Sequence, residues 1–252
     1  MSSKIRRKEI DVTSQFIQPK SAKSKIGSLE IKSKFELTDK QRVILKTLLS
    51  KEIKCCFIDG LYGSSKTYLC VMAGLIELNK GNIDEVIYVR NPIEANSNQG
   101  IGFLAGSQKE KMAPYAEVFF SKIREFVSEN DLKYLEEEEF IKVLPIGFVR
   151  GLNLSRKVIV VDEASSMSYD DIFLILTRCG PDTKIFFAGD SQNQSDIGNK
   201  SGFLRMIRCF NDQESRDNGI FHFEMKDEAD IVRSPFVKFV LRKTGLIKSK
   251  TP

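Results

Sequence analysis

The feature that most constrains the fold of this chain is a glycine-rich loop between an apolar run and an amphipathic run. Residues 54–59 predict a buried strand, and residues 67–78 predict a helix that stops near Gly81. Between them lies the sequence Gly60-Leu61-Tyr62-Gly63-Ser64-Ser65-Lys66-Thr67. Glycines in this context let backbone N–H groups turn inward around phosphates, and the helix N-terminus adds positive potential. The pattern predicts a Walker A loop that binds the phosphates of a nucleotide.

Each polar residue of this loop has an expected role. Lys66 is expected to reach the outer phosphates, and the Thr67 hydroxyl to ligate magnesium. Ser65 stands where the usual pattern has glycine immediately before the lysine, which predicts weaker affinity or altered loop geometry. The other residues predicted to contact the nucleotide are Gly60, Leu61, Tyr62, Gly63, Ser64, Tyr68 and Gln41.

The rest of the chain predicts an α/β fold. Continuous apolar runs at residues 85–90, 141–144, 157–161 and 184–188 are typical of buried strands. Amphipathic runs over about 38–49, 115–126 and 169–178 predict helices between them. Strands spaced by helices indicate a mainly parallel sheet covered on both faces. The Gly-, Asn- and Ser-rich stretch from Asn91 to Pro114 predicts a long functional loop.

Length and composition predict one domain with tails. We expect a basic arm over residues 1–34, a folded domain over 35–245 and a short basic tail over 246–252. The formal net charge is +5, and the basic arm suits either polyanion binding or a solvated tail.

The cysteines and the single histidine exclude other classes of site. Five cysteines, three of which flank the loop at Cys55, Cys56 and Cys70, predict free thiols and a reducing, cytoplasmic compartment. His222 alone cannot build a histidine-based metal site, so metal binding would depend on oxygen ligands. The sequence has neither a long apolar run nor an apolar segment behind its basic N-terminus, which predicts a protein that is neither exported nor membrane-spanning.

A second motif supplies two adjacent carboxylates. The apolar strand at 158–161 ends in Asp162-Glu163-Ala164, as a Walker B strand does. Asp162 is expected to hold magnesium through water, and Glu163 to orient and polarise the attacking water. By itself an acidic strand end is weak evidence, but together with the upstream loop it predicts ATP or GTP binding.

A third strand ends with a polar run that starts at Gly189-Asp190. A glutamine here could contact the γ-phosphate or the attacking water and report the nucleotide state. Gln192 and Gln194 compete for this role, and we favour Gln194. A polar turn is the simpler alternative.

At this point the chain resembles the PhoH-like family of superfamily-one helicase-like ATPases. Beyond the Walker motifs and Gly-Asp followed by glutamine, the resemblance rests on Arg90-Asn91-Pro92, Glu94-Ala95, Gly102-Phe103-Leu104-Ala105-Gly106, Glu110-Lys111-Met112-Ala113-Pro114-Tyr115 and Asp230-Ile231-Val232-Arg233-Ser234-Pro235. It runs from about Phe35 to Leu241. Asn91, Ala105 and Ser65 depart from the family pattern. The single domain with variant motifs also suits a virus-encoded homologue, whose compartment would be the host cytoplasm.

The resemblance implies a P-loop NTPase domain of the RecA-like, three-layer type that uses ATP and Mg²⁺. It also implies RNA-related work, so we expect single-stranded RNA or DNA as a partner and a homo-oligomer, with a hexameric ring as one form. Arg233 is the preferred arginine for transition-state charge, while Arg90 and Arg178 could serve in the same site or across a subunit boundary. Unwinding is doubtful because such helicases usually use two motor domains.

Two other functions stay open. One is a nucleotide-gated binding or scaffold protein with little hydrolysis, motivated by Ser65 and the shifted glutamine motif, against which Glu163 argues. The other is a small-molecule or nucleoside kinase, which shares the loop but fits the Asp-Glu pair poorly.

Overall fold

The centre of the protein is a six-stranded sheet in which each strand runs parallel to its neighbours. A computed structural model describes residues 10–11, 26, 29–90, 108–152, 154–192 and 197–247. The strands, in their order across the sheet, are β5 (Ile141–Pro145), β4 (Glu85–Arg90), β6 (Lys157–Asp162), β7 (Lys184–Gly189), β3 (Cys55–Gly60) and β8 (Ile220–Met225). All six strand directions agree, so the carboxyl ends of β3, β6 and β7 meet at one edge.

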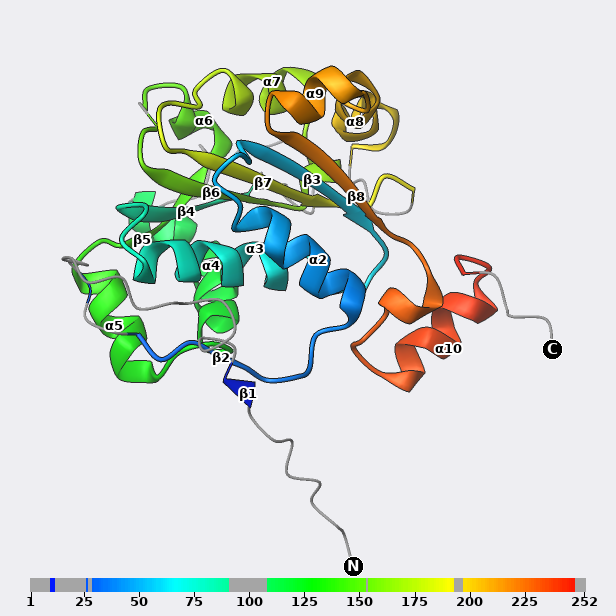
Figure 1. The fold of residues 1–252 in the computed structure, drawn as a ribbon, viewed down its shortest axis with the longest axis horizontal. Helices are drawn as coiled ribbons and strands as arrows, with labels where there is room; N and C mark the ends of the chain where they lie inside the picture. The colour runs from blue at the N-terminus through cyan, green and yellow to red at the C-terminus, as the bar shows by residue number, and fades with distance from the viewer. Residues whose placement is uncertain are drawn as a thin grey trace, which may run out of the picture.

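Helices cover both faces of this sheet, as Figure 1 shows. One face carries α2 (Asp39–Leu48), α3 (Lys66–Asn79), α4 (Gln108–Ile123) and α5 (Glu129–Glu137). The other carries α6 (Ile146–Val149), α7 (Tyr169–Leu176), α8 (Phe203–Cys209) and α9 (Gln213–Asp217). Short 3-10 turns lie at Ala164–Ser166, Gly198–Lys200 and Glu228–Asp230. The predicted three-layer α/β class with a parallel sheet is confirmed.

Alternate residues of the strands fill two separate cores. Along β3, Cys56 and Ile58 belong to the core under α3, while Cys55 and Phe57 belong to the core under α7 and α8. This alternation follows from the two-residue period of a strand, and both faces are apolar because both are covered. The cysteines of the described residues are free, and burial raises the pKa of the thiols of Cys55, Cys56 and Cys70. The predicted free thiols are confirmed.

The folded part extends beyond both predicted boundaries. Leu29 and Ile31 are buried in the core, and the side chain of Asn79 holds the backbone N–H and C=O of Leu29. Residues Lys32–Ser33 form β2, which pairs antiparallel with β1 (Ile10–Asp11). At the other end Ile247 is buried. Buried side chains therefore lie on both sides of the predicted limits at residues 34 and 246, and these domain limits stay a prediction.

Two further elements differ from the sequence prediction. Helix α4 begins at Gln108 and includes Pro114, so the predicted loop through Pro114 ends earlier. A proline removes one backbone donor, yet the helix continues because Phe119 and Ile123 are fully buried. Strand β8 was not predicted, since it is an edge strand whose residues, His222 and Glu224 among them, are mostly half-buried or exposed.

The last helix, α10 (Pro235–Lys243), lies apart from the sheet layers, beyond the carboxyl end of β8 (Figure 1). It shares a small core with the phosphate loop, formed by Leu61, Ile231, Leu241 and Ile247. Among the helices that the structure describes, none is long and apolar enough to cross a membrane.

Candidate nucleotide-binding site

The predicted phosphate loop connects the carboxyl end of β3 to the first turn of α3. Gly63 has a φ of +77°, and a Cβ added to it would lie 3.0 Å from the Cβ of Arg233. Ser64 is buried and its Oγ donates to the Leu61 carbonyl at 2.7 Å. The loop is thus closed on itself, with the N-terminus of a 14-residue helix at its end. This is the arrangement that presents backbone N–H groups and a helix dipole to an anion.

Ser65 adopts the left-handed conformation that the usual glycine would take. Its φ and ψ are 65° and 28°, and it caps α3 without a side-chain hydrogen bond. An L-residue pays about 1–2 kcal/mol for this conformation, whereas glycine does not. The loop therefore keeps its conformation with serine in place of glycine at position 65, at the cost of backbone strain.

Replacing Ser65 with glycine should relieve that strain. We expect Ser65→Gly to raise the free energy of unfolding by about 1 kcal/mol and the melting temperature by about 2–4 °C. Ser65→Ala keeps the left-handed cost and should give no gain. Thermal denaturation of the three proteins checks this, and an equal rise in the alanine variant would show that strain is not the cause.

Lys66 lies in the loop with its ammonium group held by backbone carbonyls. Its Nζ donates to the carbonyl oxygens of Gly60 at 2.6 Å and Leu61 at 3.0 Å. Burial lowers the pKa of Lys66, against the opposing effect of carboxylates that include Asp190 and Glu163. A buried cation at this place offers a strong contact for phosphate oxygens.

Thr67 and Asp162 meet as the magnesium prediction requires. The Thr67 hydroxyl donates to Asp162 Oδ1 at 2.6 Å, and the Tyr88 hydroxyl donates to Asp162 Oδ2. Lys122 Nζ lies 3.9 Å from the same Oδ2. Burial and the Asp162 charge raise the pKa of Tyr88, so it remains a hydrogen-bond donor. A hydroxyl and a carboxylate are the hard oxygen ligands that Mg²⁺ prefers, and they fit this ion.

Glu163 follows Asp162 at the end of β6 and turns the chain. Its φ of 52° is left-handed, and it precedes the 3-10 turn Ala164–Ser166. Its Oε1 lies 4.0 Å from Arg90 Nη2, and its side chain is about one quarter exposed. A partly accessible carboxylate beside the phosphate loop can accept a proton from water.

One cavity of about 740 Å³ brings these groups together. Its lining includes most of the predicted set, with Arg233, Asp162 and Glu163 beside Tyr62, Gly63, Ser65, Lys66, Thr67 and Tyr68. Sequence reasoning missed part of the lining, namely Lys34, Phe35, Ala188, Lys122, Glu125 and Val232. The Tyr68 ring packs between Phe35 and Phe126, with centroids at 4.6 and 4.3 Å. Val232 lies in the motif at residues 230–235, which predicts no role for it, and the others come from segments that carry no nucleotide-binding motif.

Three of the predicted loop residues, Gly60, Leu61 and Ser64, do not line the cavity. The other predicted residues have different outcomes. Gln41 does not line the cavity; its Oε1 accepts from the backbone N–H of Thr38, and its buried Nε2 has no acceptor among the described residues. Gln192 is exposed, and its N–H donates to Asp190 Oδ1 at 3.0 Å. Gln194 lies outside the described residues. Arg178 is exposed, and its neighbour Cys179 pairs with Leu154, which precedes the amino end of β6. Arg178 therefore lies at the edge of the sheet opposite the phosphate loop, away from the nucleotide site of the same chain.

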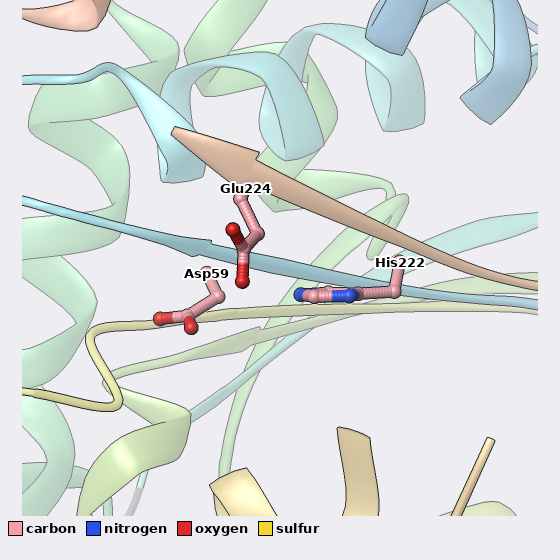
Figure 2. Close-up of side chains that lie close together, drawn as sticks. All are labelled: Asp59, His222 and Glu224. Carbon is pink, nitrogen blue, oxygen red and sulfur yellow. The ribbon is translucent and has the colours of Figure 1, made fainter. Parts of the chain in front are cut away.

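Beside the loop, Asp59, His222 and Glu224 gather on neighbouring strands, as Figure 2 shows. Lys226 Nζ already lies 2.6 Å from Asp59 Oδ2 and 3.4 Å from Glu224 Oε1, and Ser191 donates to both Asp59 oxygens. The lysine therefore supplies the cation that a metal would supply. Burial lowers the pKa of His222, which keeps its ring neutral near pH 7. The cluster joins the ends of β3, β7 and β8.

The parallel sheet, the phosphate loop after β3 and the Asp162-Glu163 pair after β6 define a P-loop NTPase fold of the RecA-like type. A family model described as "PhoH-like protein" matches residues 34–244. The chain belongs to the PhoH-like protein family.

Curated relatives agree with this assignment. The chain is 30% identical over 183 residues to a PhoH-like protein of Bacillus subtilis, covering 72% of this chain and 55% of that one. It is 28% identical over 217 residues to a PhoH-like protein of Synechocystis, covering 85% and 63%. The chain thus spans about half to two thirds of the length of these relatives.

Solved structures with a similar arrangement are more distant. The Sulfolobus solfataricus SWI2/SNF2 ATPase core in complex with dsDNA has a TM-score of 0.45 and 13% identity, covering 83% of this chain and 48% of that one. The Pyrococcus furiosus Hef helicase domain has a TM-score of 0.42 and 15% identity, covering 73% and 37%.

Proposed function

We propose that this protein binds ATP with magnesium, hydrolyses it, and couples turnover to binding of single-stranded RNA or DNA. The observation that carries the proposal is the meeting of Lys66, Thr67, Asp162 and Glu163 at one cavity. Thr67 and Asp162 are in direct contact although they lie 95 positions apart in the chain. A nucleotide-hydrolysing site needs these four roles together.

Each residue has a distinct part in the proposed reaction. Backbone N–H groups of the loop and Lys66 hold the phosphates. Thr67 and Asp162 would hold magnesium, which offsets charge on the phosphate oxygens when bound. Glu163 accepts the proton of the attacking water, and Arg233 at the cavity wall stabilises charge on the leaving phosphates. Gln41, whose buried Nε2 has no acceptor among the described residues, is proposed to contact the base.

The proposed binding of single-stranded RNA or DNA is based on the charge of the chain. The chain carries a formal charge of +5, and nine of its basic residues fall within the first 34 positions: Lys4, Arg6, Arg7, Lys8, Lys20, Lys23, Lys25, Lys32 and Lys34. Lys34 lines the nucleotide cavity, so this basic segment ends at the site. Basic surface of this kind supplies most of the affinity for a phosphate backbone. A homo-oligomer, with a hexameric ring as one form, and a cytoplasmic place of action stay predictions.

The alternative is a nucleotide-gated scaffold with little hydrolysis. It is motivated by the strained Ser65 and by the carbonyl contacts that hold the Lys66 ammonium within the loop. The two functions agree on nucleotide binding and differ on phosphate release.

Phosphate release from ATP tests the proposal. We expect turnover by the purified protein with Mg²⁺, an increase on addition of single-stranded RNA or DNA, and loss of ATP binding in Lys66→Ala, because the lysine supplies the buried positive charge of the loop. Lys133→Ala, at an exposed lysine of α5 outside the cavity, is the matched control and should turn over normally. ATP binding without phosphate release under every condition would favour the scaffold instead.

A further inference from the structure

Helix α10 presents an apolar stripe to solvent. The side chains of Phe236, Phe239 and Val240 are 71%, 47% and 37% exposed, and their spacing of three and four residues places them on one helix face. An adjoining face carries Val237 and Leu241, which pack into the small core beneath the helix. Two exposed phenyl rings on a single short helix form a patch that is typical of an interaction site.

The helix and the residues that follow it in the sequence carry charges of one sign, although Glu228, which precedes the helix, pairs with Arg242 at 3.5 Å. From Ile231 to the end of the sequence there are no acidic residues, and the basic residues are Arg233, Lys238, Arg242, Lys243, Lys248 and Lys250. The Lys243 ammonium lies 5.9 Å from the centroid of the Phe239 ring. Interfaces between proteins are generally depleted in lysine, whereas polynucleotide sites combine basic groups with exposed rings. The composition therefore favours a polyanion with flat, apolar groups.

The stripe is attached directly to the phosphate loop. The Val232 N–H donates to the Gly63 carbonyl at 3.0 Å, and Ile231 and Leu241 share a core with Leu61. Gly63 lies so close that an added Cβ would come within 3.4 Å of Val237 Cγ1. A change in the loop on nucleotide binding would consequently displace the start of α10.

We propose that the α10 stripe, formed by Phe236, Phe239 and Lys243, binds single-stranded nucleic acid. Bases stack on the two phenyl rings and the lysine contacts phosphate. This inference rests on the proposed function and names the surface that would serve it. It also gives a short path of contacts from the bound strand to the nucleotide site, through Val232 and Gly63.

Fluorescence anisotropy with labelled U20 RNA and T20 DNA tests the site, each at 50 and 200 mM salt. We expect the double variant Phe236→Ala/Phe239→Ala to bind at least tenfold more weakly, since stacking on each ring contributes substantially to affinity. Lys243→Gln should lower the salt slope by about 0.7. The RNA and DNA arms show which strand is preferred. The matched control is Phe173→Ala on α7, a ring 53% exposed on another face, which should bind normally.

ATP turnover separates this inference from the proposed function. In the double variant, turnover without nucleic acid should match the parent while stimulation by the strand is lost. Absent turnover in the parent would refute the proposed function, yet strand binding that depends on the two rings would still support the site. Unchanged strand binding in the double variant would overturn the inference. A fall in the mass of the double variant from oligomer to monomer, measured by light scattering, would also overturn the inference. The stripe would then contact a second copy of this chain.

Discussion

Glu163→Gln should reduce ATP turnover by about 10²- to 10⁴-fold while ATP binding persists. The change keeps the size of the side chain but removes the carboxylate that accepts a proton from water, and proton transfer of this kind contributes a factor of that order. Asp162, Thr67 and Lys66, which contact one another or the loop, remain in place. Phosphate release and binding of a fluorescent ATP analogue measure the two properties separately.

Glu224→Gln is the matched control for this variant. Glu224 lies near the carboxyl end of β8, at the same edge of the sheet as Glu163. Its side chain is 60% exposed, and it does not line the nucleotide cavity. It should turn over ATP as the parent does. Undiminished turnover in Glu163→Gln would remove this residue from the proposed mechanism, while loss of binding would assign it to holding the nucleotide.

Asp59→Asn should cost about 3 kcal/mol of unfolding free energy, or roughly 10 °C in melting temperature. Asp59 is 1% exposed and accepts from Lys226 at 2.6 Å and from Ser191 N–H at 2.8 Å. The asparagine leaves Lys226 without its buried counter-ion and turns an amide donor toward other donors. Because the cluster joins β8 to β3, the edge strand should loosen first. Denaturant unfolding measures the loss.

Glu36→Gln tests whether burial is the cause. Glu36 pairs with Arg42 at 2.8 Å, a similar distance, but its side chain is 75% exposed. Exposed pairs contribute at most about 1 kcal/mol, so this variant should unfold nearly as the parent does. A Lys226→Met change added to Asp59→Asn should recover part of the loss by removing the charge that has lost its buried partner. Equal losses in the two carboxamide variants would contradict the role of the buried cluster.

The local parts of the site were predictable because their chemistry lies in consecutive residues. The Gly60 to Thr67 loop and the Asp162-Glu163 pair each combine an apolar strand with the polar residues that follow it. A strand's period, a helix start and a glycine turn depend on neighbouring residues alone. For the same reason the α/β class and the paired layers of helices were predicted correctly.

The wrong predictions share a different cause. The sequence around Pro114 predicts a loop, and the sequence of β8 does not predict a strand. The structure places a helix and a parallel edge strand there, because Phe119 packs into the core and β3 offers an unpaired edge. Two apolar residues, Leu29 and Ile31, are too few for the sequence to predict a buried segment. Both nevertheless join the core cluster that contains Phe126, whose carbonyl accepts from the Lys32 N–H.

The sequence by itself determined the class of fold, the phosphate loop and the two carboxylates, and together with further motifs such as that at residues 230–235 it indicated the family. Only the tertiary structure decided that Tyr88 and Lys122 meet Asp162, that Arg233 lies against Gly63, and that α10 is attached to the loop. The physical reason is the range of the interactions. Backbone geometry is local and depends on adjacent residues. The closing of a cavity depends instead on which surfaces, distant in the sequence, bury apolar area against one another.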